Sequence, residues 1–384
     1  MAEKKPVVCF PFTGDLVGGS HVSAMGLIKA LDRDRFTPLV VLHSTNGPLA
    51  EFFRQQGLDF EAAPVSAHPE FSGPRDVKAM TRFLRLLPPI MSFLRSRNIR
   101  IVHTNDGRVH ATWGLAAKLS GVKLLWHHRS DPNSFGLRWM APWLASHIVS
   151  VSRFAGPRPG RIFNASRRSS VVHSPFESTV GDQIDRPACR AQLVSEIGCP
   201  ADTFIVGYVG ALVNRKRPLV FVDTIAALRK LRPGRPVAGV LFGDVFDGMD
   251  AAVARRAEAL GVQDHVHFLG FRYPGTPWIA ALDALLVTAV DEPFGRTLIE
   301  AMLVGTPVIA ADSGGNPEAI VPGKNGLLVQ PDDPDAFARA LAALMDEPGR
   351  KQDIADTAFR EARVRFGVPQ HVRAISDIYD RLLS

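Results

Sequence analysis

The sequence predicts two α/β domains, each a parallel sheet covered by helices on both faces. Short apolar runs with the composition of β-strands alternate with longer helical patterns almost from end to end, which is typical of parallel sheets. A chain of 384 residues is too long for one comfortable α/β core and suits two domains of similar size. Its hydrophobic content of 46% and charged content of 22% indicate a chain that folds throughout.

Seven strands are expected in the first half of the chain, separated by segments whose apolar residues have helical spacing. These strands are Val7–Phe12, Pro38–Leu42, Asp59–Ala62, Ile101–Thr104, Lys123–His127, His147–Val151 and Ser170–His173. A polar stretch with two prolines, residues 174–189, follows them and predicts a linker between the domains.

A second series of strands follows the linker. These strands are Phe204–Val209, Val237–Phe242, Val266–Leu269, Ala284–Thr288, Pro307–Ala311 and Gly326–Val329. From about Asp335 onward the pattern indicates consecutive helices without a further strand. Ligands of open parallel sheets bind beyond the carboxyl ends of the strands. Two such sheets facing one another form a deep cleft, so functional residues are expected just after strands in both halves.

Positive charge is concentrated in the first half of the chain. Residues 1–180 carry 23 Lys and Arg against 12 Asp and Glu, whereas residues 181–384 carry 22 against 26. This asymmetry fits an anionic partner such as phospholipid, lipid-linked phosphate or nucleic acid, and it fits a solvated basic surface without a partner equally well.

The cysteine count and the hydropathy pattern bear on the cellular location of the protein. Three cysteines are too few for a disulfide framework and form no metal-ligand pattern with nearby histidines, which favours a reducing cytoplasm. The N-terminus lacks the apolar run of a signal peptide, and no segment approaches the roughly 18 apolar residues that span a bilayer. Any membrane contact is therefore expected to be peripheral.

One helical segment combines basic and apolar residues in a pattern typical of a membrane-surface helix. Its basic residues recur at intervals of three or four: Arg75, Lys78, Arg82 and Arg85. The alternative is an amphipathic helix that packs on its own sheet and is ended by Pro88-Pro89. For Trp139 and Trp143, four residues apart, packing in the core is the favoured interpretation.

The most informative segment follows the strand Ala284–Thr288. Its loop carries Glu292, and Gly295 opens a helix that contains Glu300 about two turns further on. Helical side chains lean toward the helix N-terminus, so both carboxylates can face one ligand at the start of this helix. Free N–H groups there suit a pyrophosphate, and carboxylates suit the hydroxyl groups of a ribose or another sugar.

At this point the sequence resembles a known family. The spacing Glu292-x7-Glu300 within EPFGRTLIEAMLVGTPVIA, followed by SGGNPEAI and GKNGLLVQPDD, is similar to the signature of the family 4 retaining glycosyltransferases, the group 1 glycosyltransferases, which have the GT-B fold. The resemblance covers nearly the whole chain and is densest from Ile205 to Asp333. It implies two Rossmann-like domains with parallel sheets facing a central cleft.

The resemblance also implies how the chain is divided. Residues 1–175 correspond to an N-terminal acceptor domain, and residues 176–362 correspond to a C-terminal donor domain that holds the nucleotide sugar. Residues 363–384 correspond to a terminal helix that packs back toward the N-terminal domain.

The donor site that the resemblance implies lies mainly in the second half of the chain. Glu300 would bind the ribose and Glu292 the transferred sugar. The amides after the Phe-Gly pair would hold the distal phosphate and sugar, which indicates Phe294, Gly295, Arg296 and Thr297. Further donor contacts would come from Gly18, Gly19, Gly243, Phe271 and Arg272.

A basic pair of the family, in a pattern like G-R-L-x-x-x-K, is only partly present here. Lys216 matches the family's lysine, but Ala211 stands where the arginine is common. Without a divalent metal, fixed cations must neutralise the leaving diphosphate. Arg215 or Arg217 is therefore expected to compensate.

In the first half, His127 matches a family histidine that touches the donor sugar. Together with Glu292 and Lys216 it forms the implied catalytic set, acting by positioning and charge stabilisation rather than as an acid and a base. Four residues after strands are expected on the acceptor side: Asn105, Asp106, Arg108 and Arg129.

The resulting prediction is a metal-independent, retaining hexosyltransferase without a cofactor. Its donor is a UDP- or GDP-sugar, and its acceptor is a glycan or lipid-linked acceptor in cell-envelope polysaccharide or lipopolysaccharide synthesis. The expected location is the cytoplasm, at the inner face of the membrane, in peripheral contact with anionic lipid. Two alternatives stay open: a nucleotide-sugar 2-epimerase of the same fold, and a non-catalytic nucleotide-sugar binding protein. No motif supports a nucleic-acid partner.

Overall fold

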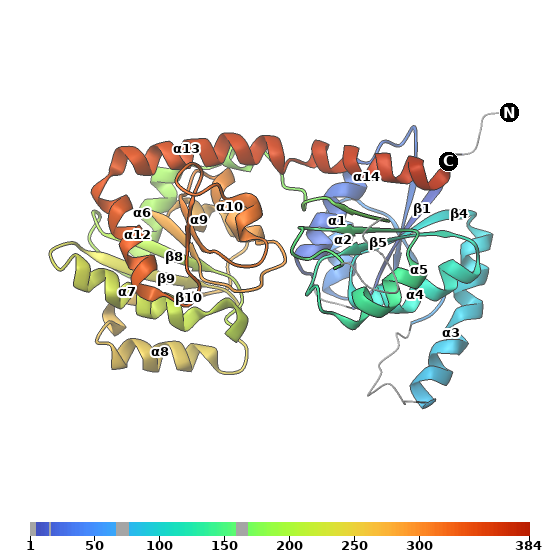
Figure 1. The fold of residues 1–384 in the computed structure, drawn as a ribbon, viewed down its shortest axis with the longest axis horizontal. Coiled ribbons are helices and arrows are strands. Elements are labelled where there is room, and N and C mark those ends of the chain that lie inside the picture. Colours follow the sequence, from blue (N-terminus) through green and yellow to red (C-terminus); the bar gives the residue numbers. More distant parts are fainter. Residues whose placement is uncertain (1–4, 15–16, 67–76, 159–167) are drawn as a thin grey trace. The chain divides into compact units, whose positions relative to one another are not determined.

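The computed structural model describes residues 5–14, 17–66, 77–158 and 168–384. It confirms two α/β units, each built on one parallel sheet (Figure 1). Unit 1 comprises Met1–Pro175 and Val368–Ser384, and unit 2 comprises Phe176–Gly367. The chain passes from unit 1 to unit 2 within the polar stretch at residues 174–189. Residues 363–367 complete the last helix of unit 2 and the turn after it, and the terminal helix begins at Val368.

Unit 1 contains a seven-stranded sheet in the order β3-β2-β1-β4-β5-β6-β7, with every pairing parallel. The strands are β1 (Val7–Phe12), β2 (Thr37–Leu42), β3 (Phe60–Ala62), β4 (Ile99–Thr104), β5 (Lys123–His128), β6 (His147–Ser150) and β7 (Ser169–Val171). All seven expected strands are present, with ends within two residues of the expected positions. Their carboxyl ends share one edge of the sheet.

The helices of unit 1 form two layers, one on each face of the sheet. They are α1 (Gly19–Ala30), α2 (Pro48–Gln55), α3 (Val77–Ser96), α4 (Gly107–Leu119), η1 (Gly136–Met140), α5 (Ala141–Leu144) and α14 (Val368–Leu383). One core joins α1, α2 and the terminal helix α14 through Leu27, Phe53 and Tyr379. The other joins α3, α4 and the η1–α5 segment through Trp113 and Trp126 (Figure 1).

Helix α3 does not end at Pro88-Pro89, as one interpretation of the sequence required. It continues to Ser96, with both prolines on its exposed side. The prolines remove two N–H donors, but Leu87, Ile90 and Leu94 are buried against the sheet. Tertiary packing of an apolar face therefore maintains the helix where local propensity opposes it.

The expectation that Trp139 and Trp143 pack in the core was wrong. Their exposed fractions are 61% and 62%, respectively. The η1–α5 segment buries Leu137 and Ala141 instead. A Cβ on Gly136 would lie 3.1 Å from the Trp126 ring, so this side of the segment faces the sheet and the two tryptophans face outward.

Unit 2 contains a six-stranded parallel sheet in the order β10-β9-β8-β11-β12-β13. The strands are β8 (Phe204–Val209), β9 (Val237–Phe242), β10 (Val266–Gly270), β11 (Ala284–Val287), β12 (Val308–Ala311) and β13 (Leu327–Val329). The helical segments are η3 (Val180–Gln183), α6 (Arg186–Ile197), η4 (Asn214–Lys216), α7 (Pro218–Leu231), α8 (Met249–Ala259), η5 (Gln263–His265), α9 (Thr276–Ala280), α10 (Arg296–Leu303), α11 (Asn316–Ala319), α12 (Pro334–Asp346) and α13 (Pro348–Arg365). As expected, only helices follow β13.

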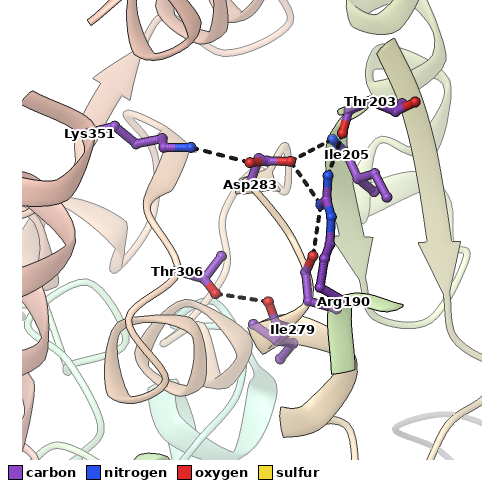
Figure 2. A network of polar contacts seen from close by, with 8 residues as sticks. Arg190, Thr203, Ile205, Ile279, Asp283, Thr306 and Lys351 are labelled. Atoms are coloured by element: carbon purple, nitrogen blue, oxygen red, sulfur yellow. Dashed lines mark hydrogen bonds and ion pairs between the residues drawn. The ribbon is translucent and has the colours of Figure 1, made fainter. Parts of the chain in front are cut away.

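Polar contacts around Asp283 connect helices to the edge of this sheet at which the strands begin (Figure 2). Asp283 precedes β11, and its carboxylate accepts from the backbone N–H of Ile205 at 2.9 Å. It also forms ion pairs with Arg190 of α6 at 2.8 Å and Lys351 of α13 at 3.2 Å. These contacts join α6, α13 and two central strands on the side opposite the carboxyl ends, which stay available for ligands.

No helix among the residues described is long and apolar enough to cross a membrane.

Among the described residues, five histidines are buried in unit 1, and the positive charge of Arg129 acts on four of them: His103, His110, His127 and His371. Burial lowers the pKa of each imidazole because it penalises the charged form, and the positive charge of Arg129 acts in the same direction. The pKa of His371 falls to about 3. All four rings are therefore neutral at physiological pH.

These lowered pKa values predict that unit 1 loses stability as the pH falls below about 6.5, where histidines of the unfolded chain become protonated. The unfolded state then binds more protons than the folded state, so the free energy of unfolding decreases. Each histidine contributes a slope of about 1.4 kcal/mol per pH unit in that range.

Urea unfolding followed by tryptophan fluorescence at several pH values would measure this loss, because the buried Trp113 and Trp126 report on unit 1. His371→Gln should give a shallower dependence than the wild type. A free energy of unfolding that stays constant between about pH 7 and pH 5 would contradict the expected linkage.

Candidate active site

The loop after β8 in unit 2, residues 210–217, is basic, and hydrogen bonds connect it to the end of β11. The hydroxyl of Thr288 donates to the carbonyl of Lys216 at 2.8 Å, and the N–H of Val290 donates to the carbonyl of Arg215 at 3.1 Å. The Lys216 side chain folds back over the end of β8, since a Cβ on Gly210 would lie 2.7 Å from its Nζ. Gly210 has a φ of +149°, which residues with a side chain rarely adopt, and its missing side chain leaves room for Lys216.

Glu292 lies on the next loop and contacts the basic one directly. Its Oε2 lies 2.6 Å from a guanidinium nitrogen of Arg215. The Ser313-Gly314-Gly315 turn after β12 holds its backbone: the N–H of Gly315 donates to the Glu292 carbonyl at 2.8 Å. A Cβ on Gly314, whose φ is +61°, would lie 2.5 Å from that same oxygen. The turn therefore needs glycine both for its conformation and for its contact with the Glu292 loop.

Helix α10 begins at Arg296, directly after the Glu292 loop, with Gly295 as its N-cap. Gly295 has no capping side chain, so the first N–H groups of the helix are suited to an anionic ligand. Arg296 forms an ion pair with Glu300 at 3.2 Å and stacks over the Phe176 ring at 4.3 Å. Each of the two predicted carboxylates thus has an arginine beside it.

Other expected donor residues have varied surroundings. Phe294 is buried, with its ring 5.6 Å from that of Phe366, and Thr297 is half-buried in the first turn of α10. Gly243 packs tightly after β9: a Cβ there would lie 2.0 Å from the carbonyl oxygen of Gly210. Gly243 therefore shapes the same sheet edge that carries Lys216.

Three expected cations point to different partners. Arg215 contacts Glu292, whereas Arg217 forms an ion pair with Asp332 at 2.8 Å. Arg272 forms an ion pair with Glu196 of α6. Phe271, which lies between β10 and Arg272, has an exposed ring. Of the three, Arg215 is the one that the structure brings to the Glu292 loop.

In unit 1, the end of β5 brings together three of the expected residues. His127 is fully buried, and its Nδ1 lies 3.3 Å from a guanidinium nitrogen of Arg129. The guanidinium of Arg129 also donates to the side-chain oxygen of Asn105, at 3.3 and 3.4 Å, and to the hydroxyl of Ser174 at 3.2 Å. Asn105, His127 and Arg129 therefore form one cluster at the carboxyl edge of the unit 1 sheet.

The remaining expected residues of unit 1 lie at helix starts. Asp106 caps α4 and accepts from the N–H of Val109 at 3.0 Å, while Arg108 is exposed in the first turn of that helix. Gly18 caps α1, next to Gly19, and donates its N–H to the ring of His21 at 3.1 Å. A capping role accounts for Asp106 without a ligand.

Sequence reasoning missed three members of the unit 1 cluster. His103 lies 3.0 Å from the Nδ1 of His127, and the hydroxyl of Tyr379 lies 2.5 Å from the other ring nitrogen of His103. The ring of His371 lies 5.8 Å from the ring of His127. Tyr379 and His371 come from the terminal helix α14, so no spacing pattern in the sequence connects them with the strands.

Two family models match the chain. Residues 191–361 match the model described as glycosyl transferases group 1, and residues 18–177 match the model of the glycosyl transferase 4-like domain. The first match contains the basic loop, Glu292 and α10. The second contains the cluster around His127 and Arg129.

Curated relatives align with part of the chain. The chain is 32% identical over 248 residues to D-inositol 3-phosphate glycosyltransferase 2 of Catenulispora acidiphila, across 62% of this chain and 54% of the relative. It is 32% identical over 188 residues to the lipopolysaccharide core biosynthesis mannosyltransferase LpsB of Rhizobium meliloti, across 48% of this chain and 53% of the relative. The chain thus spans about half the length of these curated relatives.

A solved structure extends the likeness to nearly the whole chain. The crystal structure of Anabaena HepE in complex with UDP and glucose has a TM-score of 0.79 at 23% identity, covering 97% of this chain and 99% of that one. With the two parallel sheets, this likeness confirms the GT-B fold. By these matches, residues 18–177 correspond to a glycosyl transferase 4-like domain and residues 191–361 correspond to a group 1 glycosyl transferase domain.

Proposed function

We propose that this protein transfers a sugar, with retention of configuration, from a UDP- or GDP-sugar to a glycan or lipid-linked acceptor. The observation that carries the proposal is that Arg215 and Lys216 lie with Glu292 and the start of α10 at one sheet edge of unit 2. This edge offers cations and N–H groups for a diphosphate beside carboxylates for sugar hydroxyls.

In this proposal the chain itself stabilises the leaving group, without a metal or another cofactor. A nucleoside diphosphate gains negative charge as the sugar leaves. Lys216, Arg215 and the N–H groups at the start of α10 neutralise that charge from fixed positions. Glu300 accepts from the ribose hydroxyls, and Glu292 accepts from a hydroxyl of the sugar.

Retention follows if the acceptor attacks the face that the diphosphate leaves. The bond between the anomeric carbon and the phosphate oxygen breaks, the acceptor oxygen forms the new bond, and its proton passes to the departing phosphate. His127 contacts the sugar during this step, and Asn105 with Arg129 orients the acceptor. None of these residues acts as a nucleophile.

The names of similar proteins support the choice of substrates. One relative is described as acting on inositol 3-phosphate and another as acting in lipopolysaccharide core synthesis, while the structural neighbour binds UDP and glucose. The proposed setting is envelope glycan synthesis in the cytoplasm, at the inner face of the membrane.

A thermal-shift panel of UDP- and GDP-sugars, followed by product analysis, tests this proposal. One nucleotide should raise the melting temperature by mass action. With that donor and no acceptor, only slow hydrolysis is expected, whereas a 2-epimerase would interconvert the sugar.

Glu300→Gln should reduce the thermal shift, because a ribose hydroxyl loses its charged acceptor. Rapid epimer formation, or no stabilisation by any nucleotide sugar, would refute the proposal.

The basic loop offers a matched pair of variants. Arg215 replaces the cation missing at Ala211, because it contacts Glu292, whereas Arg217 contacts Asp332. Arg215→Ala should lower kcat/KM for transfer about tenfold to a hundredfold, the loss expected for one charge-assisted hydrogen bond. Arg217→Ala should change it much less. Steady-state kinetics on both variants decides between the two arginines, and equal losses would contradict the assignment of Arg215.

We also propose that unit 1 contacts anionic lipid through its α3–α4–α5 layer. On α3, Lys78, Arg82 and Arg85 are exposed beside Met80 and Leu84, and the described part of the helix has no acidic residue; Arg75 lies outside the described residues. In the same layer, three aromatic rings four residues apart are exposed: Phe135, Trp139 and Trp143. Basic residues attract anionic headgroups, and tryptophan favours the interface between water and lipid.

Co-sedimentation with vesicles tests this contact. Phosphatidylglycerol vesicles should bind the protein, and phosphatidylcholine vesicles should bind it much more weakly. Replacing both Arg82 and Arg85 by Glu should lower vesicle binding about tenfold or more, since each basic residue near such a surface contributes about 1 kcal/mol. Lys230→Glu with Arg255→Glu, in unit 2, is the matched control. If both double variants lose the same binding, the contact is non-specific charge attraction and the proposed surface is wrong.

A further inference from the structure

The hydrogen bonds around His127 determine which of its ring nitrogens carries the hydrogen. A guanidinium group only donates, so the Nδ1 of His127, 3.3 Å from Arg129, must present a lone pair. The neighbouring Nε2 of His103, 3.0 Å from that same Nδ1, is then the donor. A neutral imidazole carries one hydrogen, so the hydrogen of His127 is on Nε2.

Tyr379 completes this chain of contacts. Because the hydrogen of His103 is on Nε2, its Nδ1 is an acceptor, and the Tyr379 hydroxyl donates to it at 2.5 Å. Burial raises the pKa of Tyr379, so the phenol keeps its hydrogen. The direction of donation therefore runs from Tyr379 through His103 to His127.

The terminal helix determines a second tautomer nearby. The Nδ1 of His371 lies 2.7 Å from the carbonyl oxygen of His173, which can only accept, so the hydrogen of His371 is on Nδ1. Its Nε2 is then an acceptor. The rings of His127 and His371 are nearly parallel, with an interplanar angle of 17° and centroids 5.8 Å apart.

Both histidines leave one buried nitrogen unused. Among the residues that the structure describes, the Nε2 atoms of His127 and His371 have no hydrogen-bond partner. A buried polar atom without a partner costs about 1–3 kcal/mol, and structural histidines normally avoid that cost. One nitrogen is a donor and the other an acceptor. A hydroxyl group, which both accepts and donates, complements this pair.

We propose that Tyr379 is a positioning residue that holds His127, through His103, in the tautomer that offers its Nε2–H to a substrate hydroxyl, with His371 as the matching acceptor. The assignment of the substrate hydroxyl to a sugar rests on the proposed glycosyl transfer. The assignment of the tautomers does not. The charged and titratable groups that act on His127 are Arg129, His103, His371 and His110. None of these is a carboxylate that would compete for its Nε2–H.

Nitrogen-15 NMR on the full chain with labelled histidine reads the tautomers directly. In the wild type, His127 should be protonated at Nε2 and His371 at Nδ1. Tyr379→Phe removes only the donating hydroxyl, so His103 and His127 should populate the opposite tautomers as well. Thr112→Val is the matched control, because it removes another buried hydroxyl of unit 1, one that donates to the Arg108 carbonyl.

The NMR outcomes decide the proposal. A wild-type His127 protonated at Nδ1 overturns it without any variant, even if Tyr379→Phe fails to fold. Unchanged tautomers in a folded Tyr379→Phe variant overturn the role of Tyr379.

A kinetic arm separates this inference from the proposed function. Tyr379→Phe should lower kcat for transfer about tenfold, the loss expected for about 1.4 kcal/mol of misdirected hydrogen bonding. The nucleotide-induced thermal shift should stay the same, because the nucleotide binds in unit 2, and Thr112→Val should leave both unchanged. If the tautomers of His103 and His127 change in Tyr379→Phe while kcat does not, Tyr379 positions His127, but His127 takes no part in transfer.

Discussion

The ion pair between Arg215 and Glu292 is the contact on which the account of the donor site depends. It links the loop after β8 to the loop after β11, two neighbouring strands of the unit 2 sheet. The Ser313-Gly314-Gly315 turn holds the second loop from the next strand, through a contact that only glycine permits. Three strand ends thereby present a cation, a carboxylate and the start of α10 together, in positions that contacts within the chain hold.

Much of this site could be predicted from the sequence, because its parts are close together along the chain. Glu292 and Gly295 lie in one loop, and Glu300 lies in the helix that follows it, so the sequence alone indicates that they are near one another. The choice between Arg215 and Arg217 could not be predicted. The two residues are two positions apart, and only the fold shows that one contacts Glu292 and the other Asp332.

The unit 1 cluster and the outer helices show the limits of local patterns. All the expected strands formed, since a run of buried apolar residues is a strong local signal. His371 and Tyr379 were missed because α14 reaches the sheet only through the tertiary fold. The outward Trp139 was misjudged because spacing indicates a shared face of a helix but not whether that face is covered.

Hydrogen exchange with and without UDP, or GDP if the panel selects it, tests the central claim that the nucleotide binds at the carboxyl edge of the unit 2 sheet. We predict that the nucleotide slows exchange in the loop at residues 210–217, in the Glu292 loop and in the first turn of α10. No change is expected in α8, on the outside of unit 2. Protection confined to unit 1, or spread evenly over the chain, would contradict this binding site.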